Sequence, residues 1–119
     1  MQGNMFALPI CVPGTLTADV SFRFQAPFDM QLVKVTAGCD NALTFILDIG
    51  TAADLDAYLD AVTVTGVTAT TTEYDRDDFV DDQYPHISDG DEVVVTIDYN
   101  GGDGNDSANV SVVLWFYEG

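Results

Sequence analysis

The sequence predicts an all-β fold: an antiparallel β-sandwich in one domain spanning residues 1–119, with an eight-stranded jelly roll as the expected topology. Three observations lead to this prediction. Apolar and polar residues alternate with a period of two in several segments, the pattern of a strand with one buried face. Turns rich in Gly, Pro, Asn and Asp separate about eight such segments. The length of 119 residues suits one core and is too short for two conventional domains.

Four segments show the alternation most clearly. Residues 15–24, TLTADVSFRF, have apolar side chains at every even position, Ala18 included, and polar side chains at every odd position. The same alternation occurs at residues 6–12, 43–49 and 93–99. Each segment is therefore predicted to be a strand of an antiparallel sheet with one face buried and one face in water.

Other strand-like segments have less regular patterns, at residues 30–37, 61–66 and 67–73. In the first of them, the adjacent apolar residues Leu32 and Val33 break the alternation, and a β-bulge at this point would restore it. The last segment, ANVSVVLWFYE at 108–118, has apolar residues at both odd and even positions. Both of its faces are therefore expected to be covered.

One segment, GTAADLDAYLDA, has a helical pattern. Thr51 can cap its first turn, and Leu55 and Leu59 lie four residues apart on one face, which predicts a short helix near residues 52–60. Residues 74–91 form the longest irregular stretch of the chain. This stretch is too long for an ordinary hairpin turn and is predicted to be a loop.

Two acidic segments are candidate calcium sites. GGDGNDSAN at residues 101–109 overlaps a nonapeptide that binds calcium in β-rolls, but it occurs only once. We interpret it as the hairpin loop between the last two strands. Asp75, Asp77 and Asp78 are weak calcium candidates, since their segment does not satisfy the EF-hand pattern and a solvated loop is the simpler interpretation. We therefore expect no metal and no cofactor.

The charge of the chain excludes several classes of partner. Twenty acidic residues against three Lys or Arg give a formal net charge of -17 at pH 7, so neither nucleic acid nor an anionic membrane is an expected partner. The sequence begins without a secretory leader and holds no apolar run that could span a bilayer, which predicts a soluble chain that is not exported. Cys11 and Cys39 are expected to be thiols rather than a disulfide.

The sequence offers little for catalysis. His86 is the one histidine of the chain, it follows a proline, and no G-x-S-x-G segment is present. Pairs of carboxylates can be chosen freely among twenty acids, so they carry no signal without geometry. We expect a protein that is not an enzyme.

The last strand contains the candidate interaction residues. Val113, Trp115 and Tyr117 form an apolar stripe on its expected outer face, where a monomer would favour polar side chains. Either another element of the same chain covers this stripe, or a neighbouring subunit does. A carbohydrate-binding surface would also use such rings.

Three elements of the sequence resemble the capsid decoration, or cement, proteins of tailed bacteriophages. They are the F-x-A-P-F turn at Phe24–Phe28, the D-x-G at Asp48–Gly50 followed by an acidic segment, and the G-D turn at Gly90–Asp91 before a Val-rich strand. This family consists of small β-sandwich proteins of the jelly-roll type, and the resemblance extends over most of the chain.

The resemblance implies a structural virion protein. Such a protein is made in the host cytoplasm, binds the outer surface of the capsid, bridges subunits of the major capsid protein, and is often a homotrimer. The alternative is a carbohydrate-binding β-sandwich module that uses Trp115, Tyr74, Tyr84 or the loop aspartates. The family supplies no catalytic motif, and the assignment of Val113, Trp115 and Tyr117 to an interface comes from their pattern alone.

Overall fold

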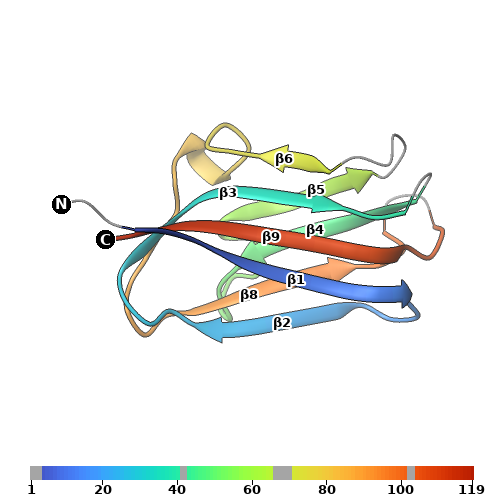
Figure 1. Cartoon of the computed structure of the whole chain (residues 1–119), viewed down its shortest axis with the longest axis horizontal. Helices are drawn as coiled ribbons and strands as arrows, with labels where there is room; N and C mark the ends of the chain where they lie inside the picture. The colour runs from blue at the N-terminus through green and yellow to red at the C-terminus, as the bar shows by residue number, and fades with distance from the viewer. Residues whose placement is uncertain (1–3, 41–42, 66–70, 102–103) are drawn as a thin grey trace.

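Strands make up most of the chain, and the computed structural model describes residues 4–40, 43–65, 71–101 and 104–119. Within these ranges nine strands are present: β1 (Met5–Thr15), β2 (Val20–Gln25), β3 (Met30–Gly38), β4 (Thr44–Gly50), β5 (Leu59–Thr65), β6 (Thr72–Tyr74), β7 (His86–Ile87), β8 (Glu92–Asp98) and β9 (Ala108–Glu118). They form two sheets in which every pair is antiparallel (Figure 1). The predicted β-sandwich is confirmed.

The order of the strands is that of a jelly roll. One sheet has the order β1, β9, β3, β6, with β7 also paired to β3, and the other has the order β2, β8, β4, β5. Successive strands alternate between the two sheets, except that β4 and β5 pair as neighbours and β6 and β7 both pair with β3. Eight strands thus carry the predicted topology. The count is nine rather than eight because the two-residue β7 forms within the predicted loop.

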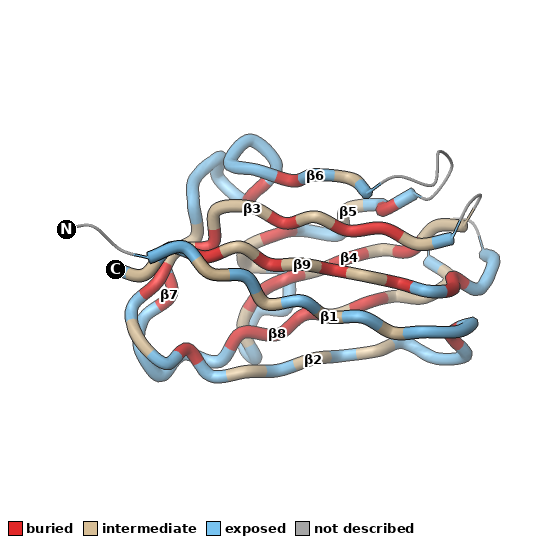
Figure 2. Tube along the Cα trace, in the orientation of Figure 1, coloured by how far each residue is buried: buried red, intermediate tan, exposed pale blue. Residues whose placement is uncertain are grey.

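The core lies between the two sheets and is built from the inward positions of the alternating strands. The central strands β9 and β8 bury their inward residues almost completely, and so do β3 and β4 (Figure 2). These fully buried side chains include Leu32, Val35, Phe45, Leu47, Ile49, Val95, Ile97, Leu114 and Phe116. Burying a side chain of this size contributes about 1.5–3 kcal/mol relative to leaving it exposed, so the alternation fixes which face of each strand points inward.

The predicted strands agree with the structure apart from some of their ends. The prediction for residues 15–24 is wrong at its start, because β2 begins only at Val20 and residues 16–19 turn between the sheets. Residues 66 and 67–70 of the predicted strands 61–66 and 67–73 lie outside the described residues. The β-bulge is confirmed, since the pairing of β3 with β9 shifts between Leu32 and Lys34.

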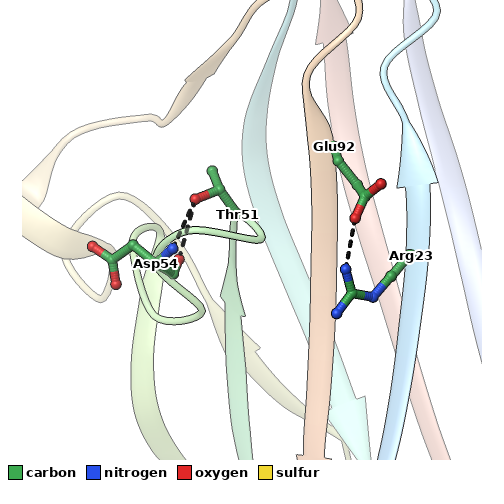
Figure 3. Close-up of polar contacts among 4 residues, drawn as sticks. All are labelled: Arg23, Thr51, Asp54 and Glu92. Carbon is green, nitrogen blue, oxygen red and sulfur yellow. Dashed lines mark hydrogen bonds and ion pairs between the residues drawn. The ribbon is translucent and has the colours of Figure 1, made fainter.

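The predicted helix near residues 52–60 is wrong. The segment is a compact loop in which Thr51 and Asp54 each accept a backbone hydrogen bond from the other's N–H, and the Thr51 hydroxyl also accepts from the Asp54 N–H at 3.1 Å (Figure 3). A short helix gains few hydrogen bonds for its nucleation cost. Here β5 begins at Leu59 instead, and the loop packs so closely on Gly50 that an added Cβ would lie 2.6 Å from the Ala57 nitrogen. No helix in the described ranges is long and apolar enough to cross a membrane.

The hairpin interpretation of residues 101–109 is also wrong. β8 and β9 lie in different sheets, so this segment carries the chain across the sandwich instead of joining two paired strands. Gly102 and Asp103 lie outside the described residues. Gly104 has a φ of 81°, which is the left-handed backbone expected of a glycine in a turn.

The predicted loop at residues 74–91 is largely irregular but well anchored. It contains the short 3-10 turn η1 (Val80–Asp82) and the strand β7. Phe79, only 2% exposed, inserts into the core, and Ile87 is fully buried. The loop is therefore held to the sandwich at two points.

Candidate functional site

The predicted interaction residues lie on the outer face of β9. Val113, Trp115 and Tyr117 point away from the core, because their neighbours Leu114 and Phe116 are fully buried. Val113 and Trp115 are half-buried, and Tyr117 is 44% exposed. β9 lies between β1 and β3, with the second sheet behind it, and Figure 1 shows no described segment in front of these three strands. Within the described residues, no further layer of the chain covers the stripe.

Apolar side chains of β1 extend the stripe. Met5, Ala7 and Pro9 pair with Tyr117, Trp115 and Val113, and all three are exposed. Cys11 follows on the same face, also exposed, and is not joined to Cys39 by a disulfide. We define the outer apolar face by these residues: Met5, Ala7, Pro9, Cys11, Val113, Trp115 and Tyr117.

Sequence reasoning missed the contribution of β1 to this face. A signal was available, because both the odd and the even positions of residues 5–12 are apolar. The alternation at residues 6–12 predicts only that the even positions face the core. A strand that is apolar on both faces indicates a second buried or associating surface.

The outer apolar face is almost free of acids in a strongly acidic protein. β1 and β3 contain no acidic residue, and β9 has Glu118 only at its end. Lys34, opposite Trp115, forms an ion pair of 3.2 Å with Glu73 of β6, and both side chains are substantially exposed, so the pair adds little stability. By contrast, the outward positions of the second sheet are mostly polar or charged: Ser21, Arg23, Gln25, Asp48, Thr63, Glu92 and Thr96.

Charge on this second sheet is partly paired. Arg23 of β2 donates to Glu92 of β8 at 2.8 Å (Figure 3). The pair is diagonal, since Arg23 is opposite Val94 and Glu92 is opposite Gln25. Both side chains are about half-exposed. The two sheets therefore present chemically different outer faces, one apolar and one polar.

The indole N–H of Trp115 lacks a hydrogen bond within the described part of the chain. Its Nε1 atom is shielded from solvent and has no hydrogen-bond acceptor among the described residues. A buried donor without a partner costs about 1–3 kcal/mol. Buried polar atoms usually have a hydrogen-bond partner, so in the described ranges the indole N–H of Trp115 lacks a bond that such a group normally makes.

A second apolar surface lies along one long side of the sandwich. The edge strands β1 and β2 end their sheets on this side, and their inward residues are only half-buried (Figures 1 and 2). We call this surface the β1/β2 edge and define it by Phe6, Leu8, Ile10, Val12, Val20, Phe22 and Phe24. At the opposite side, Leu59, Val64 and Tyr74 of β5 and β6 are buried. The sandwich is thus more open along β1 and β2.

The weak calcium candidates lie together in the turn after β6. The Asp75 N–H donates to Asp78 Oδ2 at 3.0 Å, and the Asp77 N–H donates to Asp75 Oδ1 at 3.2 Å. All three residues are exposed. Two of the three carboxylates therefore accept hydrogen bonds from the backbone of their own turn, which is a common role of Asp in turns.

Another acidic group forms at the β4–β5 loop. Carboxylate oxygens of Asp48, Asp56 and Asp60 lie within 4.8 Å of one another, and Asp48 Oδ1 also accepts the Ala61 N–H at 2.7 Å. In the same loop, the pKa of Asp54 is raised by its side-chain hydrogen bond with Asp56, by desolvation and by the charge of Asp56. The three aspartates lie on β4, on the loop and on β5, and their spacing matches no metal-binding sequence motif.

The rings proposed for carbohydrate binding do not lie together. Tyr74 is 7% exposed and pairs with the inward residue Val35, so it faces the opposite side of the sheet from Trp115. Tyr84 lies on the segment between η1 and β7 and is exposed. These three rings therefore do not form the row that a flat saccharide platform requires.

Comparison with known proteins gives a match by structure. The sequence matches no protein-family model and no curated protein. The structure is similar to a chain of the capsid asymmetric unit of cyanophage Pam1, with a TM-score of 0.56 and 17% sequence identity. The similarity covers 99% of this chain and 87% of that chain. At this identity, the two chains are shown to share a fold.

Proposed function

We propose that this chain is a structural, non-enzymatic virion protein that decorates the outside of a tailed-phage capsid. In this role it is made in the host cytoplasm, forms a homotrimer, and stabilises the head by bridging subunits of the major capsid protein. It uses no cofactor and no metal, and it binds neither nucleic acid nor membrane. The outer apolar face, with Val113, Trp115 and Tyr117 at its centre, is its self-association surface.

The observation that carries this proposal is the contrast between the charge of the chain and the charge of that face. Two copies with a net charge of -17 repel each other wherever their acidic surfaces approach within a Debye length of about 8 Å at physiological ionic strength. The strands β1, β3 and β9 together hold a single acid, Glu118. Copies of this chain can therefore meet there with the least repulsion and the greatest burial of apolar area.

Two different apolar surfaces that share β1 support the proposed trimer. A two-fold dimer joins identical patches, whereas a three-fold ring joins one patch to a different patch on the next subunit. The outer apolar face and the β1/β2 edge are two such patches. β1 contributes to both, with its odd-numbered residues on the first and its even-numbered residues on the second. Packing the face of one copy on the edge of the next covers both surfaces, and in the proposed trimer three such contacts close a ring.

Two further observations support a capsid role. The sequence resembles capsid decoration proteins, and the chain of similar fold comes from the capsid of cyanophage Pam1. The acidic surfaces left outside a trimer suit a partner with basic patches, because opposite charges speed association and fix orientation. A protein with this role needs a rigid fold and two interfaces, both of which the sandwich can provide.

The proposal is tested by sedimentation with purified heads. The chain should pellet with heads of the virus that encodes it and should saturate at a fixed number of copies per capsid subunit. Heads of an unrelated phage are the control and should leave the chain in the supernatant. A chain that stays in the supernatant with its own heads would remove the decoration role, and binding on a glycan array would then support the carbohydrate-binding alternative.

A further inference from the structure

A small pocket lies at one end of the sandwich, and none of the residues that define the outer apolar face lines it. It has a volume of about 230 Å³ and is formed by the β4–β5 loop and the segment from η1 to β7. Two tyrosines, Tyr58 and Tyr84, and one acidic residue, Asp81, are among the residues that line it. Gln83 and His86 complete its polar lining.

The walls of this pocket are fixed by backbone hydrogen bonds. The Val80 N–H donates to the Tyr58 carbonyl at 3.0 Å, which ties the two segments together. The Leu32 N–H donates to the Pro85 carbonyl at 3.0 Å, which ties the far wall to β3. Because Phe79 is also buried in the core, the pocket is preformed, as binding sites usually are.

The 3-10 turn η1, which contributes Asp81 to the pocket, has an unusual backbone conformation. Asp81 and Asp82 have φ values of 62° and 52°, in the left-handed region that non-glycine residues rarely adopt. Asp is one of the residues that tolerate this conformation best, and such positions cluster at functional sites. This turn thus supplies an acidic residue, Asp81, to the lining of the pocket.

The electrostatics of the pocket favour a cation. None of the described residues that line it is Lys or Arg. Partial burial raises the pKa of the Tyr58 hydroxyl, and the charge of Asp91, which lies outside the lining, raises it further. A negatively charged guest would meet Asp81 and the field of a chain with net charge -17.

The size of the pocket favours a single side chain. Pockets for drug-sized ligands have volumes of about 300–1,000 Å³, and this pocket is smaller. A guanidinium group fits such a site chemically, because it stacks on aromatic rings and donates two parallel hydrogen bonds to one carboxylate. Arginine is also among the residues that most often anchor protein interfaces.

We propose that the pocket between Tyr58 and Tyr84 is a docking site for an arginine side chain of a protein partner, with Asp81 as its counter-ion. This inference rests on the proposed function for its source, since the partner that supplies the arginine is the capsid shell. It gives the acidic end of the molecule a specific contact with the shell, separate from the outer apolar face through which copies associate.

The chemistry of the pocket is tested by NMR titration of the full chain with N-acetylarginine amide. Saturable shifts are expected for the resonances of Tyr58, Tyr84 and Asp81, and N-acetylcitrulline amide, which has the same shape without the charge, should give none. Tyr84→Ala and Asp81→Asn should each weaken arginine binding about fivefold or more. Tyr117→Ala is the matched control, because its ring is also exposed but lies on the outer apolar face, and it should bind arginine as the wild type does.

Two results of this titration would overturn the inference. Equal shifts with citrulline would show that charge is not recognised, and no shifts with arginine would show that the pocket does not bind it. If methyl glucoside causes shifts and N-acetylarginine amide causes none, the pocket binds a sugar and the arginine proposal is wrong.

Sedimentation with heads separates this inference from the proposed function. If Tyr84→Ala pellets more weakly than the wild type while its oligomeric mass is unchanged, the shell supplies the guest. If Tyr84→Ala pellets as the wild type does, the docking inference fails and the decoration role stands. If the wild type does not pellet, the decoration role and the shell as the source of the arginine both fail.

Discussion

Lys34 of β3 lies directly opposite Trp115 of β9 because Val33 is an extra residue in the ladder between these strands. Without this β-bulge, Val33 would oppose Trp115 and Lys34 would oppose the buried Leu114. A one-residue slip exchanges the two faces of a strand, so the ammonium group would then enter the core. The bulge keeps Lys34 in water, next to Trp115, and returns Val35 to the core.

Trp115→Ser tests the self-association surface. The substitution removes the largest side chain from the outer apolar face, so the purified protein should change from three times the mass of one chain to the mass of one chain in light scattering. The fold should be retained, because Trp115 lies outside the core and its indole N–H has no acceptor among the described residues. Thermal unfolding followed by circular dichroism checks this.

Ile46→Ser is the matched control for that experiment. Ile46 is a half-buried apolar residue on β4, between the inward residues Phe45 and Leu47, and it therefore faces outward from the second sheet. Its substitution should leave the oligomeric mass unchanged. Equal loss of mass in the two variants would show that general destabilisation, and not the outer apolar face, controls association.

Substitutions of Leu55 and Leu59 test whether residues 52–60 form a loop, as in the structure, or the predicted helix. On a helix, the two residues would share one buried face, whereas here Leu55 is 45% exposed and Leu59 is fully buried. Leu55→Ala should therefore change the free energy of unfolding by about 0.5 kcal/mol or less, and Leu59→Ala should lower it by about 2–5 kcal/mol. Urea denaturation measures both values. A similarly large decrease in the free energy of unfolding for both variants would contradict the loop and favour a helix.

Calcium removal tests the role of the acidic turn after β6. Because Asp75 and Asp78 accept hydrogen bonds from backbone N–H groups of their own turn, the carboxylates already have partners without an ion. Excess EDTA should leave the melting temperature of the wild type unchanged. Asp78→Ala should lower the free energy of unfolding by about 0.5–1.5 kcal/mol, the usual contribution of one hydrogen bond. A melting temperature that rises with added calcium would contradict this account.

Alkaline titration tests Tyr58, which is half-buried, and Tyr74, which is buried. Burial, with smaller contributions from Asp91 and Asp78, raises the pKa of Tyr58 and of Tyr74 above the ordinary value of 10.0. Since the unfolded chain loses these protons first, the folded state should lose stability as the pH rises above about 10. Absorbance at 295 nm should show part of the tyrosine ionisation above that pH, and Tyr58→Phe and Tyr74→Phe should each remove some of this late change. A wild-type titration completed near pH 10 would contradict the prediction.

Local patterns in the sequence predict the strands well. The alternation of residues 43–49 and 93–99 identifies β4 and β8, because a strand with one buried face must repeat every two residues. The interruption at Leu32 and Val33 identifies the bulge for the same reason. These features depend on the residues of one strand and its two faces.

The features that the sequence did not predict depend on contacts between distant segments. Nothing in GGDGNDSAN tells a hairpin turn from a crossing between sheets, because both need glycine and polar residues. The spacing of Leu55 and Leu59 fits a helix, but the pairing of Ile49 with Leu59 takes the second residue into β5. The stripe at Val113, Trp115 and Tyr117 was predicted, whereas its extension by Met5, Ala7 and Pro9 became evident only from the register of β1 with β9.

The central claim, that the chain decorates the outside of a phage head as a trimer, is tested most directly by cryo-electron microscopy of heads saturated with the protein. The account predicts added density on the outer surface at three-fold positions, with β1 and β9 of each copy facing the next copy. Density inside the shell, single copies whose outer apolar face is open to solvent, or no added density would contradict it.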